Sequence, residues 1–212
     1  MPEVAVSFFL FHPYLCAQPV MQHSDNKIII IAAPSGSGKT SVTRHLLKAF
    51  NGKLAFSVSC ATRQPRNHEK NGVDYYFISP EEFKQRIANH EFAEWEMVYE
   101  GKYYGTLKSE LQRMWDNGQT PLLDVDVKGG INVQQQYPTQ SLSLFIEPPS
   151  IDELEKRLKA RGTETAESLK ARIDKASYEL SFKSQFDKVI INDDLATACT
   201  EAEDVVRKFL NP

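Results

Sequence analysis

The clearest hydrophobic pattern in the chain is the run KIIIIAA at residues 27–33, in which four isoleucines stand in succession. A continuous β-branched run of this length is typical of a strand that is buried on both faces of a parallel sheet. Shorter apolar runs at 121–127, 141–146 and 188–191 predict further strands. The pattern therefore indicates a sheet that lies inside the molecule.

Helix signals separate these apolar runs. Ser79 is followed by Pro80 and two glutamates, which predicts an N-cap, a proline at the first helical position and acidic side chains in the first turn of a helix. Ser150 and Glu153 have the spacing of a capping box. Helices are expected at 40–50, 80–89, 107–117, 130–136, 150–159, 164–184 and from Leu195 onward, with further strands at 54–59 and 74–78 and a hairpin at 99–105. Strands that alternate with helices predict βαβ units, so we expect an α/β fold with a parallel sheet.

Composition narrows the class of protein. The 212 residues are 41% hydrophobic and 25% charged, which is ordinary for a folded domain with a self-sufficient core. A formal net charge of −3 creates no global field that would recruit nucleic acid or an anionic membrane. Cys16, Cys60 and Cys199 are far apart, which disfavours a zinc ribbon or a disulfide framework and favours a reducing, cytoplasmic setting. Cys199 falls on the apolar side of the last helix and is expected in the core.

The first 24 residues stand apart from this pattern. Their apolar run at 4–11 is too short to span a bilayer, and the only charged side chain before it is Glu3, whereas a secretory signal begins with basic residues. No other segment approaches the ~18 consecutive apolar residues of a membrane-spanning helix. We expect residues 1–24 to be a disordered extension: a dispensable tail, a start codon placed ahead of Met21, or a docking segment that uses Phe8, Phe9 and Phe11.

The string APSGSGKT at residues 33–40 has the spacing of a phosphate-binding P-loop, with Ala33 in place of the first glycine. Gly36 and Gly38 let successive backbone N–H groups turn toward phosphate oxygens, and the start of the following helix favours negative charge. Lys39 supplies a cation and Thr40 a hydroxyl for Mg²⁺. A glycine-rich surface turn would not explain a lysine at this spacing directly after a buried strand. The residues expected at this donor site are Ala33, Pro34, Ser35, Gly36, Ser37, Gly38, Lys39, Thr40 and Ser41.

A second predicted strand ends in acidic residues, in the sequence LLDVD. Ligands of open α/β sheets bind at the carboxyl ends of the strands, so Asp124 could hold Mg²⁺ through water. Asp124 and Asp126 are two residues apart and are expected on one face of the strand. The alternative is a carboxylate that only caps a neighbouring turn.

A third group of residues carries a resemblance to a known family. Arg63 and Arg66 flank a proline in SVSCATRQPR, and two arginines at this spacing could hold one phosphate through paired hydrogen bonds. Together with GVDYYF, EFAEW, GKYYGT, LLDVDVKG, RGTET and VIINDDL in this order, this string resembles the guanylate kinases over residues 27–210.

The resemblance implies the three-layer α/β fold of the P-loop NTPases, built around a parallel central sheet. It implies a core at residues 25–58 and 107–212, an inserted mixed GMP-binding region at 59–106, and a helical lid at 157–172. The implied activity is transfer of the γ-phosphoryl group of ATP to GMP with Mg²⁺, a step of purine nucleotide recycling.

The resemblance also implies roles for individual residues. The GMP phosphate would be held by Arg63, Arg66, Tyr75 and Tyr104. Guanine would be recognised by Ser59, Glu94, Thr106 and Asp126, with Thr106 at a position where serine is expected. Guanine carries N1–H and N2–H donors, whereas adenine lacks the N1–H and would leave a buried Glu94 unpaired. Mg²⁺ would be bound by Thr40 and, through water, by Asp124.

On the donor side, Asn192 would lie near the ATP base. Lys39 and the lid arginines Arg157, Arg161 and Arg172 would be catalytic, because phosphoryl transfer needs mainly positioning and charge neutralisation. Lid closure would also exclude water.

Two other classes of function stay open. The same fold could serve as a non-catalytic binding module, which the P-loop glycines, Lys39 and the lid arginines argue against. It could also be a related P-loop kinase of other nucleoside or sugar phosphates, which the strings of the guanine pocket argue against. The expected partners are the small molecules GMP and ATP rather than nucleic acid or a membrane, and the sequence does not indicate an oligomeric state.

Overall fold

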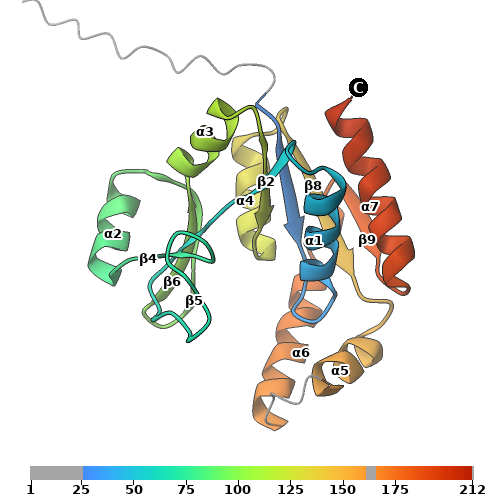
Figure 1. Ribbon diagram of the computed structural model, residues 1–212. Helices are drawn as coiled ribbons and strands as arrows, with labels where there is room; N and C mark the ends of the chain where they lie inside the picture. Colours follow the sequence, from blue (N-terminus) through green and yellow to red (C-terminus); the bar gives the residue numbers. More distant parts are fainter. Residues whose placement is uncertain (1–25, 161–165, 212) are drawn as a thin grey trace, which may run out of the picture.

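The structure is a computed structural model that describes residues 26–160 and 166–211. A five-stranded parallel sheet forms its centre, in the order β2-β7-β1-β8-β9. The strands are β1 (Ile28–Ala32), β2 (Leu54–Phe56), β7 (Thr120–Asp124), β8 (Ser141–Glu147) and β9 (Lys188–Ile191). The predicted α/β fold with a parallel central sheet is confirmed (Figure 1).

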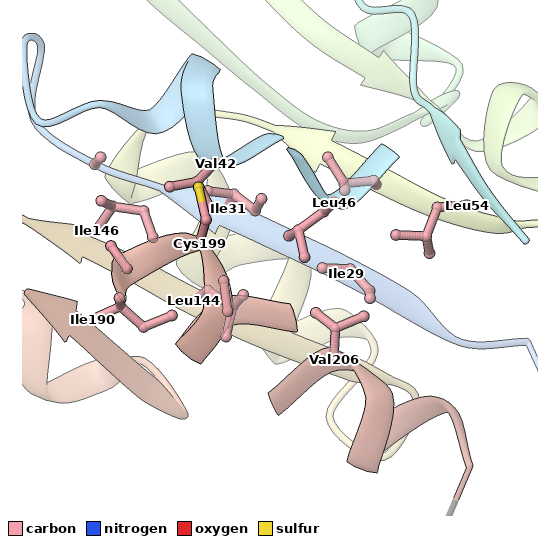
Figure 2. Close-up of a cluster of buried hydrophobic side chains, with 14 of the residues drawn as sticks. Ile29, Ile31, Val42, Leu46, Leu54, Leu144, Ile146, Ile190, Cys199 and Val206 are labelled. Carbon is pink, nitrogen blue, oxygen red and sulfur yellow. The ribbon is translucent and has the colours of Figure 1, made fainter. Parts of the chain in front are cut away.

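The isoleucine run forms the middle strand, β1, and supplies both faces of the sheet. Ile29 and Ile31 pack against α1 (Lys39–Ala49) and α7 (Leu195–Leu210), in a cluster that includes Val42, Leu46, Val206 and the buried Cys199 (Figure 2). Ile28 and Ile30 pack on the other face against Leu111, Met114 and Val133 from α3 (Lys108–Asp116) and α4 (Val127–Gln136). Each isoleucine is fully buried, which contributes about 1.5–3 kcal/mol per side chain. The result is a helix–sheet–helix sandwich with Cys199 in its core, as expected.

A smaller mixed sheet is inserted between β2 and α3 and lies beside the central sheet (Figure 1). Its order is β4-β3-β6-β5, with β3 parallel to β4 and antiparallel to β6, and β5 antiparallel to β6. The strands are β3 (Cys60–Ala61), β4 (Tyr76–Phe77), β5 (Phe92–Tyr99) and β6 (Lys102–Leu107), and α2 (Pro80–Ala88) covers one face. Phe83 of α2 stacks on Phe92 with 4.3 Å between ring centroids, which anchors the helix on this sheet.

The helix starts predicted from capping residues are confirmed. The hydroxyl of Ser79 accepts the N–H of Glu82 at 3.1 Å, and the hydroxyl of Ser150 accepts that of Glu153 at 3.0 Å. Other boundaries differ. The hairpin begins at Phe92, earlier than the expected 99–105, and the strand predicted at 54–59 ends at Phe56.

The expectation that Asp124 and Asp126 share a strand face is wrong. Strand β7 ends at Asp124, and Asp126 is the N-cap of α4, where its side chain accepts the N–H of Gly129 at 2.7 Å. This cap starts the helix at Val127, so the strand does not continue to residue 127. The two carboxylates therefore leave the chain from different elements.

Helices α5 (Ile151–Ala160) and α6 (Ala166–Leu180) extend below the central sheet in Figure 1, followed by the 3₁₀ turn η1 (Lys183–Gln185). The expected lid at 157–172 spans the end of α5 and the start of α6, and its middle, 161–165, lies outside the described residues, as does the expected extension at 1–24. Among the described residues, no helix is both long enough and apolar enough to cross a membrane.

Candidate active site

The P-loop connects β1 to α1 and depends on two glycines. Gly36 and Gly38 have φ angles of +98° and +93°, in the left-handed region that side chains rarely adopt. A Cβ on Gly36 would also lie 2.8 Å from Leu154 of α5, and a Cβ on Gly38 would lie 2.1 Å from the amide nitrogen of Asn192. Both positions therefore require glycine for conformation and for space.

Asn192 and Ser37 hold the loop in place. Asn192 follows β9, is 4% exposed, and donates its side-chain amide to the carbonyl of Ser37 at 2.7 Å. The side chain of Ser37 is fully buried. The Asn192 amide supports the loop from behind, and the expected contact of both residues with ATP stays a prediction.

A cavity lies over the P-loop, and every other residue expected at the donor site lines it: Ala33, Pro34, Ser35, Gly36, Gly38, Lys39, Thr40 and Ser41. Asp126 and residues of α6 complete its wall. Lys175 and Glu179 of α6 were not predicted as site residues, because a Lys–Glu pair at i, i+4 is typical of a solvated helix face. Glu179 is only 8% exposed, and burial raises its pKa above the ordinary range. Its carboxylate is 3.6 Å from the Lys175 ammonium group.

Lys39 joins the P-loop to the carboxyl end of β7. Its ammonium group pairs with the Asp124 carboxylate and donates to the carbonyl of Val125 at 2.9 Å. The predicted metal-binding carboxylate is therefore next to the P-loop lysine, at the edge of the sheet where ligands bind in α/β folds.

The three arginines expected on the lid have different placements. Arg172 of α6 lines the donor cavity and donates to the hydroxyl of Ser35 at 2.8 Å. Arg157 lies outside this cavity and donates to the carbonyl of Asn192 at 3.0 Å and to Glu153 at 3.3 Å. Arg161 lies outside the described residues. Of the two that the structure describes, only Arg172 lies at the donor cavity.

A second cavity lies on the face of the small sheet and adjoins the first, because Ser35, Lys39 and Asp126 border both. All the predicted acceptor residues line it except Thr106. The residues concerned are Ser59, Arg63, Arg66, Tyr75, Glu94, Tyr104 and Asp126. Thr106 is fully buried behind the wall, where its hydroxyl donates to Glu94 Oε1 at 2.7 Å. The two cavities thus meet at the lysine of the P-loop.

Arg63 lines this second cavity and is held there by several groups. Its guanidinium donates to both oxygens of Glu69, at 2.6 and 2.7 Å, and its Nε donates to the Tyr104 hydroxyl at 3.1 Å. It also lies 5.0 Å from the ring centroid of Tyr75. Hydrogen bonds from Arg63, and from the backbone N–H of Arg66, lower the pKa of Glu69 to about 2. Glu69 was not predicted, although the repeated three-residue spacing in RQPRNHE was a signal for it.

Glu94 and Asp126 lie close together in the wall of the cavity. A Cβ on Gly129 would lie 2.8 Å from Glu94 Oε2 and 2.9 Å from Asp126 Oδ1, so the glycine makes room for both carboxylates. Burial raises the pKa of Glu94 to about 7, and the nearby charge of Asp126 adds to the effect, while the Thr106 hydroxyl opposes it. A pair of acceptors of this kind, one buried and one half-buried, is suited to a ligand that presents N–H donors.

Comparisons with known proteins point in the same direction as this geometry. The family model for guanylate kinase matches residues 25–209. A guanylate kinase of Bacteroides fragilis is 54% identical over 184 residues, which cover 87% of this chain and 90% of that protein. A guanylate kinase of Porphyromonas gingivalis is 46% identical over 87% of this chain and 98% of its own length. A crystal structure of guanylate kinase from Anaplasma phagocytophilum superposes with a TM-score of 0.67 at 28% identity, covering 90% of this chain and 89% of that one.

Proposed function

This chain belongs to the guanylate kinase family, and on that premise we propose that it transfers the γ-phosphoryl group of ATP to GMP, giving ADP and GDP. The observation that carries the proposal is the meeting of two cavities at Lys39. One cavity has a phosphate-binding loop, and the other is lined by two arginines and by the carboxylates of Glu94 and Asp126. A donor and an acceptor phosphate placed in them would both lie near the lysine.

The acceptor cavity fits a guanine nucleotide at both ends. Glu94 and Asp126 offer acceptors for the N1–H and N2–H groups of guanine, with Ser59 and Thr106 as hydroxyl partners. Arg63 and Arg66, with the hydroxyls of Tyr75 and Tyr104, would hold the phosphate. Adenine has no N1–H to match Glu94, which supports selection of GMP over AMP.

The chemical step requires the protein to supply positive charge and to position the substrates. It requires no general base, because the attacking group is an anionic phosphate oxygen. Lys39 would leave its pairing with Asp124 to contact the transferred phosphoryl group. Arg172 already lies at the donor cavity, and Arg157 and Arg161 would join it when the lid closes. Closure would also exclude water from the reacting phosphates.

The residues at the donor cavity fit Mg²⁺ carried by ATP. The Thr40 hydroxyl lines the cavity and the Asp124 carboxylate stands beside Lys39, so both are the oxygen ligands that Mg²⁺ prefers, directly or through water. Bound Mg²⁺ would supply charge neutralisation to the phosphates of ATP. Among the described residues, no group of three His, Cys, Asp or Glu side chains could hold a metal ion by itself.

A coupled assay of ADP release tests the proposed function with GMP, AMP, CMP and dTMP as acceptors and ATP with Mg²⁺ as donor. The expected result is ADP release with GMP and little with the other three. Release with a different acceptor would indicate a related nucleotide kinase. No release with any acceptor, together with measurable GMP binding, would indicate a non-catalytic binding module.

A further inference from the structure

Glu96 borders the acceptor cavity and has no part in the function proposed above. It lies on β5 two residues after Glu94, so both side chains leave the strand on the same face. Its Oε2 is buried and accepts no hydrogen bond from any described residue. Because a buried carboxylate oxygen without a donor is unfavourable, this atom is suited to a donor supplied by a ligand.

The register of the hairpin locates Glu96 relative to the two ends of the cavity. Glu94 is paired with Thr106, and Glu96 is paired with Tyr104. Thr106 belongs to the guanine end, whereas the Tyr104 hydroxyl accepts a hydrogen bond from Arg63 at the phosphate end. The two pairs are about 7 Å apart along the strands. Glu96 therefore lies one cross-strand pair further along the hairpin than Glu94, in the direction of the residues that would hold the phosphate.

Glu96 also lies to one side of the phosphate ligands. It is on β5, the edge strand, while Arg63 follows β3 on the far side of β6. The ribose of a nucleoside monophosphate connects base and phosphate, so it must cross the interval between the Glu94 pair and the Tyr104 pair. The Glu96 side chain on β5 therefore borders the space that the ribose crosses. It lies apart from the arginines that would hold the phosphate.

The chemistry of the nucleotide identifies the donor. The phosphate is mostly dianionic at neutral pH and repels a carboxylate, and the N–H groups of guanine belong to Glu94 and Asp126 in the acceptor site proposed above. The ribose hydroxyls are the donors that remain. We propose that Glu96 accepts a hydrogen bond from a ribose hydroxyl of the acceptor nucleotide and so favours ribonucleotides over deoxyribonucleotides. The inference rests on the proposed acceptor site.

The test compares kcat/KM for GMP, 2′-deoxy-GMP and 3′-deoxy-GMP at saturating ATP, in the wild-type protein and in the variants Glu96→Ala and Glu96→Gln. The wild type should prefer GMP by about tenfold over the analogue that lacks the contacted hydroxyl. Glu96→Ala should lower kcat/KM for GMP by about the same factor and leave that for this analogue within about twofold. Glu96→Gln keeps an acceptor oxygen without the charge and should fall between.

Glu100→Gln is the matched control, because Glu100 is an exposed glutamate in the β5–β6 turn and does not line the cavity. It should leave all three values unchanged. An equal loss with all three nucleotides would overturn the inference, since Glu96 would then act through phosphate ligands such as Arg66. A variant without loss, or a wild type that does not discriminate, would also overturn it. A wild-type protein that does not phosphorylate GMP would contradict the proposed function rather than the inference on Glu96. If Glu96→Ala lowers the melting temperature, the kcat/KM values of Glu96→Gln test the inference in its place.

Discussion

The ionisation of Glu94 is set by the residues that surround it. The side chain is 8% exposed, and burial raises its pKa from 4.5 to about 7, with the charge of Asp126 as a further cause. In the empty site at neutral pH, this carboxyl group is therefore protonated in a large fraction of molecules. Guanine presents N–H donors and needs the carboxylate as their acceptor. Binding of GMP should thus release a proton from Glu94.

The first prediction concerns pH. Because the proton is bound only in the free protein, the Kd for GMP should rise by up to ~10-fold per unit as pH falls below about 7 and level off above it. The Kd for ATP should lack this dependence. Titration calorimetry in buffers of different ionisation enthalpy would measure the proton release directly. The phosphate of GMP ionises near pH 6, but this affects wild type and Glu94→Gln alike. Identical pH profiles for the two proteins would refute the role of Glu94.

The second prediction concerns recognition at fixed pH. Glu94→Gln replaces one acceptor oxygen by an amide donor that faces another donor. Loss of a charged hydrogen bond to a desolvated partner costs about 1.5–3 kcal/mol, so the KM for GMP should rise roughly 10- to 150-fold. The KM for ATP should change little, and discrimination against AMP should narrow. Small, equal changes in both KM values would mean that Glu94 does not contact guanine.

Single residues were predictable where a motif string contained them. Arg63, Glu94 and Lys39 stand in such strings, and each lines a cavity of the site. Glu96 and Glu179 were not predicted, because a glutamate in a charged segment looks like surface until the fold brings a cavity against it. The position of Asn192 under the P-loop could not be predicted either, since it requires β9 and β1 to be placed in one sheet with β8 between them.

At the level of elements, the P-loop combines a backbone that is held by several contacts with a lysine side chain that borders both cavities. Its backbone is fixed by glycines that tolerate no side chain and by the Asn192 amide. The Lys39 side chain, by contrast, belongs to none of the apolar clusters and is paired with Asp124 in a cavity wall. The loop backbone therefore contributes to the fold, whereas the Lys39 side chain takes no part in core packing and is available to contact phosphate.

The third prediction follows from this separation. Lys39→Ala should lower kcat by at least about 100-fold, the scale expected when a group that stabilises transition-state charge is removed. Its melting temperature should stay close to that of the wild type. Lys48→Ala, an exposed lysine in the last turn of the same helix, is the control and should retain full activity. Near-normal turnover in Lys39→Ala would remove the P-loop lysine from the mechanism.

Elements were predictable where their signals are local. Helix starts at Ser79 and Ser150 depend on a hydroxyl and an N–H three residues later, which the sequence contains. Strand β5 was missed because it alternates Glu94 and Glu96, which face the acceptor cavity, with Trp95 and Met97, which are exposed. With a polar cavity on one face and solvent on the other, the strand lacks the usual apolar side.

At the scale of the whole molecule, Glu110 links the two sheets. It lies on α3, is 4% exposed, and accepts the N–H of Val58 and the hydroxyl of Tyr76, each at 3.3 Å. Arg113 pairs with it at 2.9 Å. Val58 leads from the central sheet into the small sheet, and Tyr76 belongs to the small sheet. The Glu110 carboxylate thus holds the segment that connects the central sheet to the small sheet.

The fourth prediction is that Glu110→Ala both destabilises the protein and weakens acceptor binding. Two half-buried donors would lose their partner, at up to about 1–3 kcal/mol each, so the melting temperature should fall by several degrees. The KM for GMP should rise several-fold while the KM for ATP stays nearly constant, because the P-loop is not held by Glu110. Ser109→Ala, an exposed neighbour on the same helix, serves as the control. Parallel changes in both KM values would show that the carboxylate does not set the position of the acceptor side.

The fold class was predictable from the sequence, but the order of the strands in the sheet was not. Buried β-branched runs between helices were sufficient for an α/β fold with a parallel sheet, because such strands need helices on both faces. The order β2-β7-β1-β8-β9 is a set of pairings between segments far apart in the chain, and no local pattern encodes it. The same holds for the junction of the two cavities at Lys39, which exists only after both sheets are assembled.

The chain contains two tryptophans, one on the small sheet and one on the helix α3, which packs on the central sheet. Trp95 lies on β5 beside Glu94 and is 42% exposed, while Trp115 of α3 packs on the core and donates its indole N–H to the carbonyl of Lys27 at 3.0 Å. Their fluorescence should therefore be separable. In Trp115→Phe, the remaining emission should be red-shifted and should respond to added GMP. In Trp95→Phe, it should be blue-shifted and should report only global unfolding, so that nucleotide binding and denaturation can be followed in the same protein without an attached dye.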